Sequence, residues 1–79
     1  MFDLTGFNPA DWYWIAKTGR TYSSARNAFV YPYDFAYLAF VAKNGAASPW
    51  PIDASGQQTS ASLVEVLSFY GITAVPPAP

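Results

Sequence analysis

Apolar and polar positions near the start of the chain predict a β-hairpin. The run Trp12–Ala16 is aromatic and β-branched and is apolar on both faces, a composition typical of a strand. Lys17–Arg20 supplies a turn that contains glycine, and Thr21–Ser24 returns as the partner strand. Ala28–Tyr31 predicts a short third strand that ends at a proline. Because an isolated hairpin is barely stable in water, another element must cover at least one face of this sheet.

A first helix is predicted from about Phe35 to Lys43. Asp34 precedes it as the N-cap, and Asn44-Gly45 ends it. Its large apolar side chains sweep around most of the helical circumference and leave only a narrow strip suited to solvent. Those side chains are Phe35, Tyr37, Leu38, Phe40 and Val41. A helix that is apolar over so wide an arc lies either at the centre of a core or between two subunits.

A second helix is predicted from about Ser60 to Tyr70, capped by Thr59 or Ser60 and ended by Gly71. Apolar residues recur in it at i, i+3, i+4 and i+7, which indicates one buried stripe and one solvated face. Between the two helices, residues 46–58 are predicted to form a loop, which the Pro49-Trp50-Pro51 step stiffens.

Strands that precede helices predict a small α+β domain, with a two- or three-stranded antiparallel meander followed by two helices packed on one face. The 79 residues are enough for one domain. We divide the chain into a lead-in segment at residues 1–11, the single α+β domain at residues 12–71 and a Pro-rich tail at residues 72–79. Because proline interrupts helices and central strands, the tail is predicted to be frayed or polyproline-like.

The composition adds a deficit of charge to this picture. The chain is 52% hydrophobic and 19% aromatic but only 11% charged, whereas soluble domains carry roughly a quarter charged residues. So few ionic groups cover a surface poorly. Part of the aromatic area is therefore expected to face another protein, a second copy of the chain or a flat ligand such as a sugar.

The residue types also exclude several classes of function. The chain has no cysteine and no histidine, which removes disulfides, the usual zinc sites and the Ser-His-Asp type of hydrolase. The five acidic residues are far apart in the sequence, and there is no phosphate-binding loop or dinucleotide fingerprint, so we expect neither catalysis nor a cofactor. Four scattered cations cannot line a nucleic acid, and the longest apolar run, residues 35–42, is too short to cross a membrane.

Five residues are candidates for an interaction surface. They are Trp50, Tyr37, Phe40, Tyr22 and Arg26. Trp50, held between two prolines, is the candidate for stacking on a sugar, although the aromatic residues of so small a protein are equally explained as its core. Arg20 and Arg26, close to Tyr22, are candidates for a cation–π contact or for an anchor at the rim of an interface, with solvated surface charge as the simpler alternative.

A pattern of aromatic and small polar residues runs through most of the chain. Its parts are Trp12-Tyr13-Trp14, Tyr22-Ser23-Ser24 with the following residues to Val30, Asp34-x-x-Tyr37-x-x-Phe40, Asn44-Gly45, Trp50-Pro51 and Phe69-Tyr70-Gly71. Over about residues 11–71 this pattern resembles small tail-associated proteins of bacteriophages and prophages, of the tail-fibre or tail-fibre-assembly N-terminal type, especially those of α-proteobacteria. Phe40 stands where tryptophan is common in those proteins.

The resemblance implies a non-catalytic structural or assembly module of a phage-like tail. Its partners would be other tail or virion proteins, with a homo-oligomer included. It would reside in the virion, or in the host cytoplasm during assembly. The alternatives are a carbohydrate-binding module for recognition of the host surface and a tail-fibre assembly chaperone. No active site accompanies the family, so no functional residue is carried over from it.

Overall fold

A computed structural model of the chain describes residues 8–79, and the predicted lead-in segment lies largely outside this range. The secondary structure begins with one turn of 3₁₀-helix, followed by four short strands and two α-helices. In chain order the elements are η1 (Pro9–Asp11), β1 (Tyr13–Ile15), β2 (Thr21–Ser23), β3 (Ala28–Val30), α1 (Phe35–Asn44), β4 (Ser48–Pro49) and α2 (Ser60–Phe69). The predicted α+β class is confirmed, and the three antiparallel strands and both helices lie where the sequence indicates.

The four strands form one sheet with the order β3-β2-β1-β4. β1 pairs antiparallel with β2, and β2 pairs antiparallel with β3. β4 was not predicted, since its two residues lie inside the expected loop at residues 46–58. It pairs parallel with β1, with Trp14 opposite Ser48 and Ile15 opposite Pro49.

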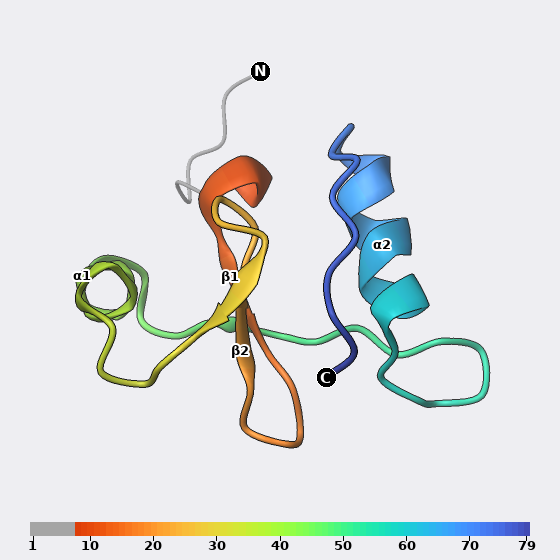
Figure 1. Cartoon of the computed structure of the whole chain (residues 1–79), viewed down its shortest axis with the longest axis horizontal. Helices are drawn as coiled ribbons and strands as arrows, with labels where there is room; N and C mark the ends of the chain where they lie inside the picture. The colour runs from red at the N-terminus through yellow and green to blue at the C-terminus, as the bar shows by residue number, and fades with distance from the viewer. Residues whose placement is uncertain (1–7) are drawn as a thin grey trace.

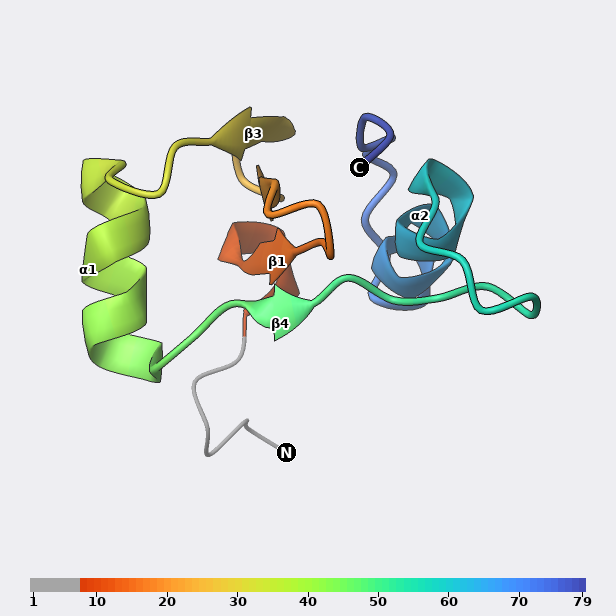
Figure 2. The same ribbon diagram turned by 90° about the horizontal axis from the view of Figure 1, so that it is seen from below.

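The two helices lie on opposite faces of the sheet (Figures 1 and 2). On one face, Tyr13 of β1 contacts Phe40 of α1, with ring centroids 4.7 Å apart. On the other face, Trp14 shares a buried cluster with Leu63 and Leu67 of α2. Side chains of consecutive strand residues point to opposite faces of the sheet. α1 therefore covers the face that carries Tyr13, and α2 covers the face that carries Trp14.

The prediction that both helices pack on one face is therefore wrong, and the parallel strand explains why. A parallel pair needs a crossover connection between its strands. Between the β3 edge and the β4 edge, the chain crosses the Tyr13 face of the sheet as α1 (Figure 2). The face that carries Trp14 is left for α2.

The main core lies between the sheet and α2. Its buried residues come from the sheet, from the positions directly after β1 and β4, and from α2. They are Trp14, Ala16, Tyr22, Trp50, Leu63 and Leu67. Among the described residues, no buried side-chain nitrogen or oxygen lacks a hydrogen-bond partner. The hydroxyl of Tyr22, for example, donates to Oδ1 of Asn27 at 2.7 Å, and burial raises the pKa of this tyrosine. The buried polar atoms of this largely aromatic core therefore have hydrogen-bond partners within the protein.

Trp50 joins the edge strand to α2. Its backbone N–H donates to the carbonyl of Ile15 at 2.8 Å, which extends the parallel pairing. Its indole Nε1 donates to the carbonyl of Thr59 at 2.9 Å, at the start of α2. The side chain is only 2% exposed. One residue thus connects the last strand, the core and the second helix.

Both helices begin with the expected caps. The carboxylate of Asp34 accepts from the backbone N–H of Tyr37 at 3.0 Å. Thr59 and Ser62 form a reciprocal capping box, in which each side chain accepts from the other residue's backbone N–H. Gly45 ends α1 with φ +96°, a conformation that favours glycine.

The Pro-rich tail does not fray. Ile72 and Ala74 pack against the main core, and Pro76 is fully buried. The carbonyl of Pro76 accepts from the hydroxyl of Ser60 at 2.5 Å, so the tail runs back beside α2 (Figure 1). The sequence interpretation considered only backbone propensity, whereas the tail is ordered by the apolar surface that it covers.

We expect Trp50→Phe to lower the free energy of unfolding by about 2–4 kcal/mol, because it removes the buried indole hydrogen bond to the Thr59 carbonyl and opens a small void. Urea unfolding followed by circular dichroism measures this loss. Phe69→Ala is the control, because Phe69 is 83% exposed and its removal should change stability by less than about 0.5 kcal/mol. Equal effects of the two substitutions would contradict the central place of Trp50.

The adjacent prolines of the tail offer a matched pair. Pro76→Ser is expected to destabilise the fold by about 1–2 kcal/mol, because it removes buried apolar area. Pro77→Ser, at an exposed position, should change stability by less than about 0.5 kcal/mol. Thermal unfolding of both variants measures this difference. Equal unfolding midpoints of Pro76→Ser and Pro77→Ser would contradict the packing of the tail.

Candidate functional site: the outer side of helix α1

Helix α1 is apolar on two sides, and the sheet covers only one of them. Phe40 is buried against the sheet, with Tyr37 and Val41 half-buried beside it. On the opposite side, Phe35 is 88% exposed and Leu38 is 49% exposed. Ala39 and Ala42 complete this side and are also exposed. The exposed residues follow the i, i+3, i+4, i+7 spacing of a helix face that packs on a partner.

Two further exposed aromatic residues precede the helix. Tyr31 and Tyr33 lie in the connection from β3 to α1, and their side chains are 70% and 73% exposed. Their rings are parallel within 3°, with centroids 5.4 Å apart. We call the set of Tyr31, Tyr33, Phe35, Leu38, Ala39 and Ala42 the α1 outer face. It contains no charged side chain.

An ion pair holds the connection that carries the tyrosines. Both terminal nitrogens of Arg26 donate to the carboxylate of Asp34, at 3.0 and 2.7 Å. Nη2 of Arg26 also reaches the hydroxyl of Tyr13 at 3.3 Å. Asp34 is at the same time the N-cap of α1, so the pair fixes the first turn of the helix to the β2–β3 turn.

The ion pair shifts the ionisation of both partners. The hydrogen bonds from Arg26, followed by the backbone N–H of Tyr37, lower the pKa of Asp34 to about 2. The hydrogen bond to Asp34 raises the pKa of Arg26. Arg26 therefore acts as a positioning residue for α1, and it makes no cation–π contact with Tyr22. Arg20 makes such a contact instead, 5.4 Å from the ring centroid of Phe29.

The structure places most of the predicted interaction residues inside the fold. Tyr22 and Trp50 are 0% and 2% exposed, so neither offers a ring face to a sugar or a partner. Phe40 is buried and Tyr37 is half-buried, both on the sheet side of α1. Two of the predicted residues, Tyr37 and Phe40, thus lie on the side of α1 that the sheet covers. Phe35, Leu38 and Ala42 share one side of the predicted helix, but the sequence did not indicate which side the sheet would cover.

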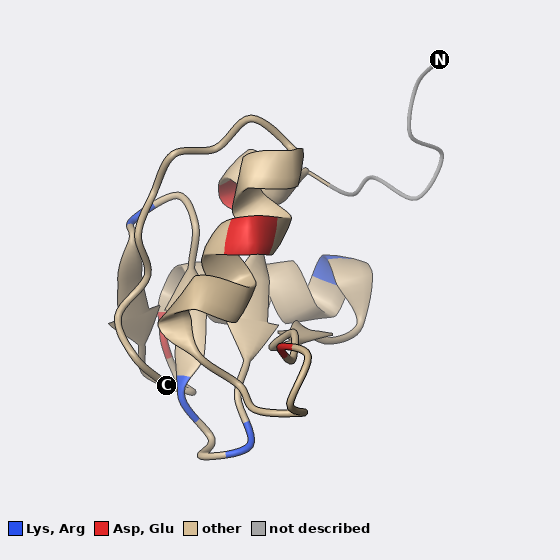
Figure 3. Ribbon diagram, turned by 90° about the vertical axis from the view of Figure 1, so that its right-hand side faces the viewer, with Lys and Arg blue, Asp and Glu red and all other residues tan. Residues whose placement is uncertain are grey.

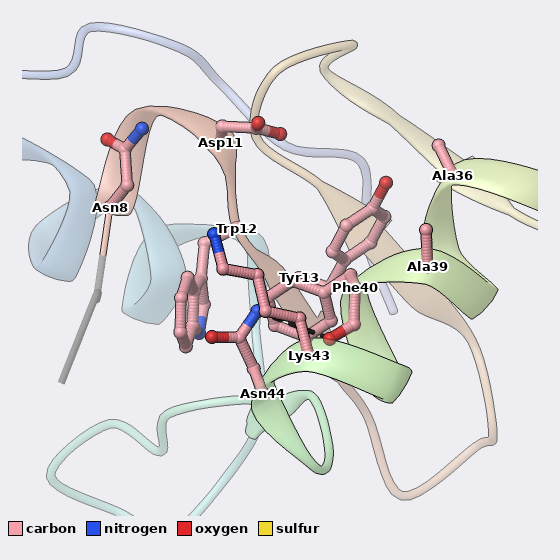
Figure 4. A pocket seen from close by; sticks show the side chains of 9 residues that line it. All are labelled: Asn8, Asp11, Trp12, Tyr13, Ala36, Ala39, Phe40, Lys43 and Asn44. Carbon is pink, nitrogen blue, oxygen red and sulfur yellow. Dashed lines mark hydrogen bonds between the residues drawn. The ribbon is translucent and has the colours of Figure 1, made fainter.

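A polar hollow of about 390 Å³ lies beside α1, between its last turns and η1. Figure 4 shows Asn8 and Asp11 on the η1 side and Lys43 and Asn44 on the helix side, with aromatic rings between them. Those rings belong to Trp12, Tyr13 and Phe40. Nδ2 of Asn44 donates to the carbonyl of Phe40 at 3.2 Å, which keeps one amide oriented at the rim. The hollow therefore has aromatic rings at its base and both hydrogen-bond donors and hydrogen-bond acceptors around it.

A smaller apolar group lies at the end of α2, on the other side of the sheet. Phe69 is 83% exposed and packs edge-to-face on Tyr70, with centroids 5.2 Å apart. Val75 in the tail is 67% exposed. This group has fewer large residues than the α1 outer face.

Charged residues are scattered over the described part of the chain and form no stripe of one sign (Figure 3). Residues 8–79 hold no cluster of three acidic side chains placed to bind a metal ion. In the same range, neither helix has the length and apolar character needed to span a bilayer.

The Arg26–Asp34 pair predicts a dependence of stability on acid. Because the pKa of Asp34 lies at about 2 in the folded state and at 3.8 ordinarily, its contribution is complete above about pH 4 and is lost as the pH falls toward 2. Asp34→Asn should lower the thermal midpoint near neutral pH and flatten its fall between pH 4 and 2. Glu65→Gln is the control, since this carboxylate of α2 has no ion pair. An unchanged acid profile in Asp34→Asn would contradict the assignment.

No protein-family model, no curated protein and no solved structure matches this chain.

Proposed function

We propose that this chain is a non-catalytic structural or assembly module that acts by protein–protein contact through the α1 outer face. The single observation that carries the proposal is the exposure of Phe35, Tyr31 and Tyr33 at 70% or more, all within the segment from residue 31 to residue 35. Large apolar side chains gathered on the surface of a small domain often mark a site of protein–protein contact.

The fold supports a binding role in a second way. The connection that presents the tyrosines is held by Asp34 and Arg26, so the rings are displayed on an anchored segment. Aromatic residues on a rigid support lose little conformational entropy when a partner covers them. Tyrosine in particular is enriched in the core of protein interfaces.

The tail context rests on the resemblance of residues 11–71 to phage tail-associated proteins. Within that context the chain is either a component of the particle or a chaperone that leaves before the particle matures. The presence of the protein in purified particles separates these two roles. Its location would accordingly be the virion, or the host cytoplasm during assembly.

A carbohydrate-binding role is the second candidate, and the hollow between η1 and α1 is the observation that favours it. Its volume of about 390 Å³ lies within the usual range of small-ligand pockets. Asn8, Asp11 and Asn44 would hydrogen-bond sugar hydroxyls above the aromatic base. The earlier form of this hypothesis, in which Trp50 stacks on the sugar, is excluded by the burial of that side chain.

The contact role is tested by co-expression with the proteins encoded beside this one in its gene cluster, with complexes measured by light scattering after gel filtration. Phe35→Ser should weaken the complex at least ~10-fold, because it removes the most exposed ring of the face. Phe69→Ser is the matched control, as Phe69 is an equally exposed ring on the other side of the sheet. Complexes that tolerate Phe35→Ser, or that are lost only with Phe69→Ser, would overturn the proposal.

The carbohydrate role makes a different prediction. Titration with a host-surface polysaccharide should change the tryptophan fluorescence, because Trp12 lines the hollow. Asp11→Ala should reduce this response, whereas Phe35→Ser should not. No response of the unmodified protein to the polysaccharide would remove this candidate.

A further inference from the structure

We infer that the partner covering the α1 outer face is a second copy of this chain, packed antiparallel across a twofold axis. This inference rests on the proposed function and names the partner of the same surface. Three properties of the face support it: the distribution of large and small residues, the absence of charge and the available area.

The sizes of the residues make the face complementary to itself. Its N-terminal half carries Phe35 and Leu38, and its C-terminal half carries Ala39 and Ala42. Turning a second copy by 180° places its large residues over the small residues of the first. A parallel arrangement would instead place Phe35 on Phe35 and leave a void between the alanines. A twofold interface uses one patch twice, so this self-complementarity is what it requires.

The charges favour the same arrangement. The α1 outer face carries no ionic group, and the net charge of the chain is only −1, so two copies do not repel each other strongly. Lys43 lies in the last turn of α1, and Asp34 caps its start. Antiparallel packing keeps the Lys43 ammonium groups of the two copies at opposite ends of the interface, and it opposes the two helix dipoles favourably.

The area is sufficient for a stable pair. An aromatic side chain contributes ~150–250 Å² when fully covered. At the observed exposures, Tyr31, Tyr33 and Phe35 together offer roughly 350–580 Å² per copy, so both copies bury about 700–1,150 Å² through these rings alone. Leu38 and the alanines bring the total to the lower end of the ~1,200–2,000 Å² that stable interfaces bury.

Sedimentation equilibrium of the full chain, from about 1 µM to about 500 µM, tests the pairing. The mass should rise toward twice the 8.6 kDa of one chain. Ala42→Lys should weaken the pairing at least ~10-fold, because it places a charge within the interface. Lysine is a good helix former and is favourable near a helix C-terminus, so the fold itself should tolerate the change.

Ser68→Lys is the matched control, since Ser68 is an exposed residue in the last turn of α2. It should leave the pairing unchanged. A chain that stays monomeric at the highest concentration overturns the inference, and so does an equal effect of the two lysine substitutions. Circular dichroism of each variant establishes that the helices are intact.

Cysteine substitutions test the antiparallel arrangement, because the natural chain has no cysteine. A mixture of Phe35→Cys and Ala42→Cys proteins should form the crossed disulfide on oxidation, whereas neither protein alone should crosslink efficiently. Efficient crosslinking of each protein with itself would indicate a parallel pair and overturn the arrangement.

The experiments distinguish a failure of the pairing from a failure of the proposed function. If the chain is monomeric but Phe35→Ser still abolishes the complex with a neighbouring tail protein, that protein covers the face and only the inference is lost. If the chain pairs as described but Phe35→Ser leaves every such complex intact, the second copy covers the face and the assembly role is lost.

Discussion

The parallel pairing of β4 with β1 is the constraint on which the rest of this structure depends. It places Trp50 immediately after the edge strand, where its backbone bonds to Ile15 and its indole enters the core. It also obliges the chain to cross the sheet from one edge to the other, which puts α1 on one face. Trp50 then bonds to the carbonyl of Thr59 and so sets the start of α2 on the opposite face. A two-residue strand therefore decides which face each helix occupies.

The two helices pack differently on the sheet as a result of this arrangement. α2 closes the main core with Leu63 and Leu67, and the tail covers part of the same apolar surface with Pro76. α1 covers the other face with a narrower stripe centred on Phe40. Because a helix has only one side toward the sheet, the remaining apolar residues of α1 face away from it. This exposed side of α1 is the surface that we propose contacts a partner.

Aromatic residues take over the tasks that disulfides, metals and charges perform in many small domains. Trp14, Tyr22 and Trp50 supply the volume of the core, and the Tyr22 hydroxyl and the Trp50 indole nitrogen each donate a hydrogen bond. The single ion pair found among the described residues, between Arg26 and Asp34, caps and orients α1. This pair lies at the start of α1, next to the segment that carries the exposed tyrosines, and the α1 outer face itself contains no charged residue.

Local chemistry was enough to predict most of the secondary structure from the sequence. The aromatic run before Gly19, the Asp34 and Thr59 caps and the Gly45 stop act within a few residues, so β1 to β3 and both helices were predicted close to their observed limits. The deficit of charge likewise indicated that some aromatic area would remain outside. These properties depend on composition and on nearest neighbours along the chain.

The tertiary structure alone decided which rings are inside. β4 is too short to show a periodic pattern, and its pairing with β1 joins residues more than thirty positions apart. Without that pairing, Trp50 between two prolines is indistinguishable from an exposed loop residue, and the two apolar sides of α1 are equivalent. Burial of Tyr22, Phe40 and Trp50, and exposure of Tyr31, Tyr33 and Phe35, follow from the crossover. Contacts between distant segments, which local propensity does not encode, select one side of a helix for the core and leave the other exposed.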